Sequence, residues 1–478
     1  MGVTVREAAT IAPSPRQLAW QELEFYAFIH FTVNTFTDRE WGLGDESPSV
    51  FQPTGLDAGQ WVEACLAAGM KGLILTCKHH DGFCLWPSAY TEHSVKNSPW
   101  RNGGGDLVRE VSDACRKAGL KFGIYVSPWD RHEPSYGDSA AYNAFFVNQL
   151  RELLTGYGEL FCVWFDGACG EGPNGKRQSY DWDAYYGIIR ELQPNAVISV
   201  CGPDVRWCGN EAGHTRSSEW SVVPATMRDN EKIQANSQQV DDGEFAKRVG
   251  SSEEDLGSRA VLAAADEAIW YPAETNTSIR PGWFYHAAED DRVKTADELT
   301  ELYERTVGGN STFLLNLPPD KRGLIHENDV ARMKELGERI RRTYGADLAA
   351  GASVIGTEGK DAEHGAGRLT DGDRSTFWQA PKGVEQAEFV IDLGSELAFD
   401  RFVLAENIRE GQRIERFRLE ASSGDGRWRP LYEGTVVGYK KICQFAETSA
   451  SRLRLTIEES RWSPTLTMIG VHRSAHGD

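Results

Sequence analysis

The chain has 478 residues, of which 40% are hydrophobic, and its formal net charge is −20. This length allows a large buried core and two or three domains. The negative charge argues against a nucleic-acid partner, because neutralising a phosphate backbone requires concentrated lysine and arginine. No apolar stretch approaches the roughly 20 residues that cross a bilayer, so we expect no membrane partner.

The cysteines favour a reducing compartment. Nine are present, several of them (Cys77, Cys162, Cys201) in apparent core strands, and none has the spacing of paired metal ligands. Such cysteines are typical of buried free thiols. The stretch from Met1 to Pro15 also lacks the basic, apolar and small-residue pattern of an export signal. We therefore predict a cytoplasmic location, and the alternative is export by a signal that has been removed.

Between residues 24 and 201 the sequence alternates predicted strands with predicted helices. Apolar, β-favouring runs predict strands at residues 24–31, 71–77, 121–127, 161–168 and 196–201. Helical spacing of apolar residues predicts helices at residues 57–68, 106–118, 140–154 and 183–192. The breaks between these elements are short, so the alternation indicates a parallel sheet with right-handed crossovers.

The next part of the chain is expected to complete the same sheet. Residues 225–262 are largely polar, and we expect long loops there with one helix and one strand. Further strands are predicted at residues 269–274 and 312–316, with a helix at 299–308. Eight strand positions indicate an α/β fold, a (β/α)8 TIM-like barrel of about 250 residues plus insertions. The carboxyl ends of its strands share one rim, where distant residues can converge.

The C-terminal part has a different pattern. A charged amphipathic helix at residues 327–344 and a linker at 345–351 precede short, alternating runs in turn-rich surroundings. These runs predict an antiparallel β-sandwich. We therefore predict two domains, a barrel over residues 1–346 and a sandwich over residues 347–478.

One strand of the predicted barrel ends on a carboxylate. The apolar run at residues 161–165 is followed by Asp166 and Gly167, the pattern of a buried strand that delivers an acidic side chain to the rim. We predict that Asp166 is a catalytic nucleophile. The alternative is an ordinary Asp-Gly turn that caps the next helix. The polar and aromatic residues at the other strand ends favour the catalytic interpretation.

Histidines and tryptophans follow several predicted strands. His79 and His80 are adjacent, so on a continuing strand they would point to opposite faces and could not share one metal ion. No His-x-His or Cys-x-x-Cys pair is present, and we predict no catalytic metal. We interpret both histidines as hydrogen-bonding groups for a polyhydroxylated ligand, or else as core residues. Indole rings could stack on a sugar or pack in the core; the candidates are Trp41, Trp86, Trp129, Trp164 and Trp283.

A carboxylate that attacks a sugar requires a second one as proton donor. Glu211 lies between Gly209 and Gly213, whose freedom would let a loop bring it to a ligand. Glu219 is the second candidate, and a solvated surface glutamate is the alternative for Glu211. A retaining mechanism would place the two carboxyl groups about 5 to 5.5 Å apart and raise the pKa of the acid.

The same residues resemble the α-L-fucosidases of glycoside hydrolase family 29. The resemblance rests on three motifs within residues 21–317: His30-Phe31, Lys78-His79-His80-Asp81-Gly82-Phe83 with Trp86-Pro87-Ser88, and Trp164-Phe165-Asp166-Gly167. Residues 34–41 and 209–211 resemble the branch that acts on α-1,3 and α-1,4 fucosyl linkages.

The resemblance implies an exo-acting, retaining double displacement on fucosylated oligosaccharides such as Lewis-type glycans. Asp166 would be the nucleophile and Glu211 the acid/base. Fucose would contact His30, His79, His80, Trp164 and Arg206, with Glu40 and Trp41 beside them. Apart from the resemblance, Trp129 and Trp283 lie near predicted strand ends, and we expect them at the rim of the same site. The resemblance implies no metal or organic cofactor. A metal-dependent hydrolase on the same barrel and a non-catalytic fucosylated-glycan-binding protein are the rival functions.

The C-terminal domain resembles a discoidin-type sandwich, commonly a carbohydrate-binding module. The resemblance rests on residues 369–378 and on the strand that ends Ile391-Asp392-Leu393-Gly394. It implies that Asp371 and Asp373 could bind a structural calcium. The alternative is a packing domain that supports the barrel without contacting sugar.

Overall fold

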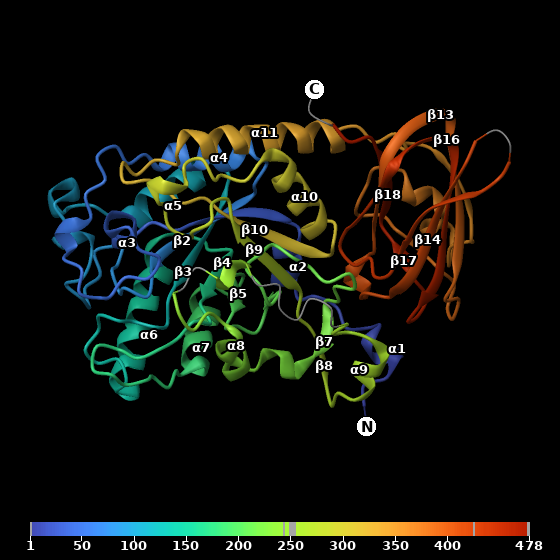
Figure 1. The fold of residues 1–478 in the computed structure, drawn as a ribbon. Helices are drawn as coiled ribbons and strands as arrows, with labels where there is room; N and C mark the ends of the chain where they lie inside the picture. Colours follow the sequence, from blue (N-terminus) through green and yellow to red (C-terminus); the bar gives the residue numbers. More distant parts are fainter. Residues whose placement is uncertain (1, 242–243, 248–254, 424–425, 476–478) are drawn as a thin grey trace.

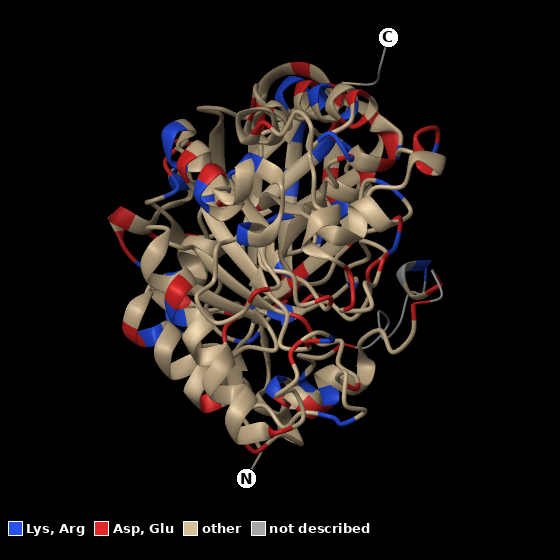
Figure 2. Cartoon of the chain, turned by 90° about the vertical axis from the view of Figure 1, so that its left-hand side faces the viewer, with Lys and Arg blue, Asp and Glu red and all other residues tan. Residues whose placement is uncertain are grey.

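The computed structural model describes residues 2–241, 244–247, 255–423 and 426–475. It contains a parallel α/β barrel and a C-terminal antiparallel β domain that lie against each other (Figure 1). This arrangement confirms the predicted fold class. Within the described residues no helix is long and apolar enough to cross a membrane. Acidic and basic residues are interspersed over the outer helices of the barrel (Figure 2).

Eight parallel strands form the barrel in the order β5-β4-β3-β2-β1-β10-β9-β6. They are β1 (Phe25–Ile29), β2 (Gly72–Lys78), β3 (Lys121–Val126), β4 (Cys162–Phe165), β5 (Val197–Val200), β6 (Arg206–Trp207), β9 (Ala273–Ser278) and β10 (Ser311–Asn316). A single parallel bridge between Ser199 and Val205 links β5 to the segment that enters β6, so the barrel is nearly closed.

Helices cover the outside of the barrel. The longer ones are α4 (Ala58–Ala67), α5 (Leu107–Ala118), α6 (Ser139–Gly156), α7 (Trp182–Leu192), α10 (Ala296–Thr306) and α11 (Glu327–Tyr344). The short ones are α1 (Val5–Ala8), α2 (Pro15–Gln21), α3 (Val33–Thr37), α8 (Asn230–Asn236) and α9 (Arg259–Ala263). Each of α4 to α7 begins after an aspartate whose carboxylate accepts a hydrogen bond from a backbone N–H of the first turn. These caps start each helix directly after its loop.

The predicted position of the sixth barrel strand was wrong. We expected it within residues 225–262, but it is β6, which has two residues and is too short to show a periodicity. The described part of 225–262 contains α8 and α9, and residues 242–243 and 248–254 lie outside the described residues. The strand predicted at 269–274 is divided at Pro272, which has no N–H to donate. β8 (Ala268–Trp270) pairs with β7 (Val222–Pro224), and β9 enters the barrel.

The two-residue alternation of the strands decides which side chains reach the rim. On β1, Phe25, Ala27 and Ile29 pack against the helices, whereas Tyr26 and Phe28 pack inside the barrel. On β4, Val163 and Phe165 pack outward, whereas Cys162 and Trp164 pack inward. His30 and Asp166 continue the inward series by one more step. Both therefore lie above the barrel interior.

The C-terminal domain has its own core and an antiparallel sheet. Its strands are β11 (Ser353–Gly356), β13 (Ala387–Ala405), β14 (Ile414–Ser422), β15 (Arg429–Gly434), β16 (Lys441–Ser460) and β18 (Met468–His472), with β12 (Trp378–Gln379) pairing β17 (Thr465–Leu466). Asn310 connects the domains: its Nδ2 donates to the carbonyl of Glu219, and its Oδ1 accepts the N–H of Tyr439.

The turn for which calcium was predicted is held by hydrogen bonds. Asp371 accepts the N–H of Asp373 and the hydroxyl of Thr376, and Asp373 accepts the N–H and hydroxyl of Ser375. These bonds engage both carboxylates in the turn itself. Calcium binding there stays a prediction.

Candidate active site

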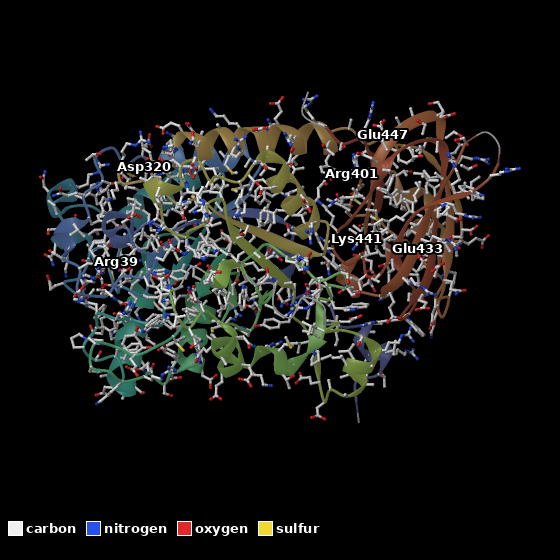
Figure 3. The ribbon with its side chains drawn as sticks, viewed as in Figure 1. Arg39, Asp320, Arg401, Glu433, Lys441 and Glu447 are labelled. Carbon is white, nitrogen blue, oxygen red and sulfur yellow. The ribbon has the colours of Figure 1, made fainter. Side chains whose placement is uncertain are left out.

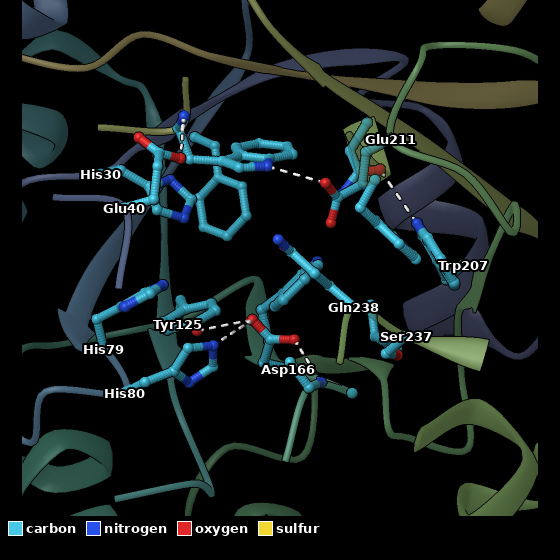
Figure 4. A pocket seen from close by; sticks show the side chains of 18 of the residues that line it. His30, Glu40, His79, His80, Tyr125, Asp166, Trp207, Glu211, Ser237 and Gln238 are labelled. Carbon is cyan, nitrogen blue, oxygen red and sulfur yellow. Dashed lines mark hydrogen bonds and ion pairs between the residues drawn. The ribbon is translucent and has the colours of Figure 1, made fainter. Parts of the chain in front are cut away.

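A pocket opens where the barrel strands end, and Figure 4 shows its lining. The predicted site residues that line it are His30, Glu40, Trp41, His79, His80, Trp164, Asp166, Glu211 and Trp283. Residues that the sequence did not single out also contribute, among them Tyr125, Trp207, Gln238 and Asn276. Tyr125, Trp207 and Asn276 lie on strands, so the two-residue alternation of side chains along each strand could have indicated that they face the barrel interior. Gln238 lies in the polar stretch after α8, where the sequence carries no such signal.

Asp166 is held in one orientation at the pocket wall. Its Oδ2 accepts the hydroxyl of Tyr125 (2.8 Å), and its Oδ1 accepts the N–H of Ala168 (2.8 Å). Burial raises the pKa of Asp166, whereas these hydrogen bonds oppose the rise. Packing requires a glycine at position 167, because a Cβ there would lie 2.1 Å from the hydroxyl oxygen of Ser237. The Asp-Gly pair thus lets the segment after α8 approach the carboxylate.

Glu211 enters the pocket from another side. Its Oε2 accepts the indole N–H of Trp283 (2.9 Å). Burial raises the pKa of Glu211 to about 8, the hydrogen bond from Trp283 lowers it, and the charge of Asp166 raises it. The flanking Gly209 and Gly213 have φ values of 103° and 74°, a region that favours glycine. Figure 4 shows the carboxylates of Asp166 and Glu211 both pointing into the pocket.

The histidines of the pocket are neutral hydrogen-bonding groups. Burial lowers the pKa of His30 and of His80 to about 3 and that of His79 as well. Ser127 donates its hydroxyl to the carbonyl of Trp129 (2.7 Å), so it accepts from Nδ1 of His80 (2.7 Å). The Nε2 of His80, 3.6 Å from Asp166 Oδ2, therefore carries a lone pair.

His30 is oriented in the same way. Asn316 donates to the carbonyl of Trp283, so its Oδ1 accepts from Nδ1 of His30 (2.8 Å). The Nε2 of His30 is then an acceptor too, and both rings are prepared to accept hydrogen bonds from hydroxyl groups of a ligand.

The two adjacent histidines both reach the pocket, because β2 ends at Lys78 and the strand alternation stops there. In the described part of the chain, His79, His80 and Asp166 are the one group of three whose ligand atoms lie within 4.8 Å of one another. Neutral imidazoles and a carboxylate are suitable metal ligands. The same lone pairs also suit sugar hydroxyls, so the absence of a catalytic metal stays a prediction.

Indole rings form the walls and floor. The Nε1 of Trp164 donates to the buried Glu274 (2.7 Å), which also accepts the hydroxyl of Tyr26, so the floor is fixed from below. Glu40 accepts the backbone N–H groups of Trp283 (2.7 Å) and Phe284 (3.0 Å). It therefore orders the loop whose indole contacts Glu211.

Trp129 and Trp86 lie outside this lining. Trp129 stands behind His80 and Trp41, with ring centroids 4.8 and 5.3 Å away, and its N–H donates to the carbonyl of Glu171. We predicted that Trp129 contacts the ligand, and the structure instead places it one layer behind. Trp86 is buried, and its indole N–H donates to Glu152. This placement agrees with the alternative that Trp86 is a core residue.

Arg206 also lies outside the pocket, which corrects the prediction that it contacts the ligand. Its Nη2 donates to Glu219 Oε1 (2.6 Å), and both side chains are buried. Alternation on β6 explains the placement, because Trp207 faces the pocket and its neighbour must face away. Glu219, the second candidate for the acid, is held by Arg206 and by Arg216 outside the pocket. It is therefore not placed to donate a proton to a ligand there.

Two carboxylates point into a pocket walled by indole rings. Asp166 accepts hydrogen bonds that oppose the rise of its pKa, whereas the pKa of Glu211 is raised to about 8. Such a pair of carboxylates is the arrangement that glycoside hydrolases use. The alpha-L-fucosidase family model matches residues 14–344, and the F5/8 type C domain model matches residues 352–469. The chain belongs to the alpha-L-fucosidases of glycoside hydrolase family 29.

Known relatives match nearly the whole length of the chain. "Alpha-L-fucosidase 1" of Arabidopsis thaliana is 40% identical over 466 residues, which are 96% of this chain and 87% of that protein. The solved structure of SpGH29 is 37% identical with a TM-score of 0.85 and covers 98% of this chain and 99% of its own. A Ruminococcus gnavus GH29 fucosidase, solved in complex with fucose, is 33% identical with a TM-score of 0.86, covering 98% and 96% of the two chains.

Proposed function

We propose that this protein is a retaining exo-α-L-fucosidase that removes terminal α-1,3- or α-1,4-linked fucose from Lewis-type oligosaccharides. The observation that supports this most is the contrast between the two carboxylates. Burial raises the pKa of both groups, but Asp166 accepts two hydrogen bonds that oppose the rise, whereas the pKa of Glu211 reaches about 8. At neutral pH one group is then suited to attack and the other to donate a proton.

In the first step Asp166 attacks the anomeric carbon, and the bond to the aglycone oxygen breaks while Glu211 protonates that oxygen. Asp166 is then esterified to the sugar. In the second step Glu211 takes a proton from water, whose oxygen attacks the same carbon, and the carboxylate of Asp166 departs. The hydroxyl of Tyr125 and the N–H of Ala168 stabilise the charge that returns to Asp166.

The pocket supplies the binding groups that a single deoxy-sugar requires. The Nε2 atoms of His30 and His80 accept hydrogen bonds from ring hydroxyls, which gain strength as positive charge develops on the sugar. Trp164 offers an apolar ring face. The Ruminococcus gnavus relative solved with fucose supports fucose as the sugar in this pocket. Glu40 and Trp41, which lie in one of the segments resembling the α-1,3/1,4 branch, line the same pocket.

The test compares two substrates in the presence of a chelator. We expect free fucose from the Lewis a trisaccharide and much less from 2′-fucosyllactose, at a rate that EDTA leaves unchanged. Faster release from 2′-fucosyllactose would overturn the linkage assignment. Loss of release with EDTA would favour the metal-dependent alternative at His79, His80 and Asp166. Binding of either sugar without any release would favour a glycan-binding protein.

The hydrogen bond from Trp283 offers a finer test of Glu211. Because this bond lowers the pKa of Glu211, Trp283→Phe should raise that pKa above its value of about 8. Glu211 would stay protonated to higher pH, and the alkaline limb of kcat/KM for a Lewis-type trisaccharide, whose leaving group needs the proton, should shift upward. Trp207→Phe is the control, because its indole lines the same pocket but donates to Asn276 (3.1 Å). An unshifted limb in Trp283→Phe would mean that another group titrates there.

A further inference from the structure

A second cavity, of about 320 Å³, lies between the barrel and the β domain. The barrel side consists of residues 214–217, the end of α10 and the glycines after it, and the other side consists of β15 and β16. None of its lining residues lines the active-site pocket. We call it the interdomain cavity.

Lys441, the first residue of β16, lines the interdomain cavity. Its side chain is buried, with 9% of the residue exposed, and among the described residues its ammonium group has no hydrogen-bond or ion-pair partner. The neighbouring Lys440 shows the contrast, because its ammonium pairs with Glu24 at 2.6 Å. Figure 3 labels Lys441 at the boundary of the two domains.

A buried ammonium without a partner is costly, because it loses hydration and gains no compensating charge. Burial lowers the pKa of Lys441, and an anion bound beside the ammonium would supply the missing counter-charge. Its position in the wall of a cavity large enough for a small molecule points to a bound anion as the missing partner.

Most of the other charged residues that line the cavity are also cations. Arg216 and Arg305 line it, whereas the carboxylate of Glu304 is already engaged by Arg401 at 3.0 Å and by the hydroxyl of Tyr344. Arg216 is partnered by Glu219 and Arg305 by Glu301, so Lys441 carries the uncompensated charge. In a chain of net charge −20, a cavity with three cations and one carboxylate is a local reversal of sign.

We propose that the interdomain cavity binds an oxyanion, a carboxylate, sulfate or phosphate group, with Lys441 as its principal partner. This site is independent of the proposed function, because the two pockets share no residue. The oxyanion can belong to a free inorganic ion or to an acidic sugar unit. The ring of Tyr432 and the amide of Gln444 in the same wall are groups that a sugar can contact.

The experiment measures binding of three probes to the full chain by calorimetry: sodium sulfate, sodium glucuronate and neutral glucose, all at equal ionic strength. We expect sulfate or glucuronate to bind and glucose not to bind. Lys441→Gln should lower the affinity for the anion about tenfold or more, because one charge-assisted hydrogen bond is lost. Arg473→Gln removes an exposed cation of the same domain, paired with Glu447, and should leave binding unchanged.

A thermal scan separates ligand binding from a structural role. Without anion, Lys441→Gln should melt at the same or a higher temperature than the wild type, because the buried unpaired charge is gone. The rise in Tm that sulfate or glucuronate produces in the wild type should be absent from this variant. Tighter glucuronate binding identifies an acidic sugar, and binding of sulfate alone identifies an inorganic ion; both support the site. No binding of either anion, or equal binding by Lys441→Gln, would overturn it.

Discussion

Asp166→Ala is expected to lower kcat for fucose release by roughly 10³-fold or more, because the covalent step loses its nucleophile. Added azide should restore turnover of an aryl fucoside and yield the β-fucosyl azide, since a small anion can enter from the face that the carboxylate occupied. Product analysis by NMR, with the initial rate, measures both effects.

Glu171→Ala is the matched control, an exposed carboxylate on the same loop after β4, and it should keep wild-type activity. Appreciable azide-independent turnover in Asp166→Ala, with the Tm unchanged, would remove Asp166 from the nucleophile role. An α-fucosyl azide product would contradict the retaining mechanism.

Glu211→Ala is expected to depend on the leaving group. Hydrolysis of a Lewis-type trisaccharide, whose sugar alcohol needs a proton, should fall by roughly 10²- to 10⁴-fold. An aryl fucoside with an acidic phenol should lose far less in its first step. Because the pKa of Glu211 is raised to about 8, wild-type kcat/KM should fall as the pH rises through that value, and this alkaline limb should vanish in the variant.

Glu219→Gln separates the two candidates for the acid. Glu219 is buried against Arg206 and Arg216, so its removal should lower the Tm by leaving these cations without their carboxylate. The leaving-group dependence and the alkaline limb should nevertheless persist. If Glu219→Gln lost the limb and Glu211→Ala kept it, the acid role would move to Glu219.

Local patterns in the sequence were sufficient for the architecture. Apolar runs bounded by glycines and capped helices predict the alternating elements of the barrel, because burial on both faces of a parallel strand leaves a continuous hydrophobic signature. The change to short alternating runs after residue 351 likewise indicates the antiparallel domain. The exception is β6, whose two residues are too few to show any period.

The placement of individual side chains needed the folded chain. The resemblance implied that Arg206 contacts the ligand, but alternation on β6 turns its neighbour Trp207 into the pocket and Arg206 toward Glu219. Trp129 follows its strand as predicted, yet Trp41 and His80 lie between its ring and the active-site pocket. Neither outcome can be derived from residue type or spacing.

From residue order alone, the fold class, the family and the strand-end position of Asp166 followed, because these depend on short-range periodicity and on compact motifs. The tertiary structure alone decided which acid faces Asp166, how the histidine lone pairs point, and that Lys441 is left without a partner between two domains. Those properties arise from contacts between residues tens to hundreds of positions apart, where burial and charge are determined by packing rather than by neighbours in the chain.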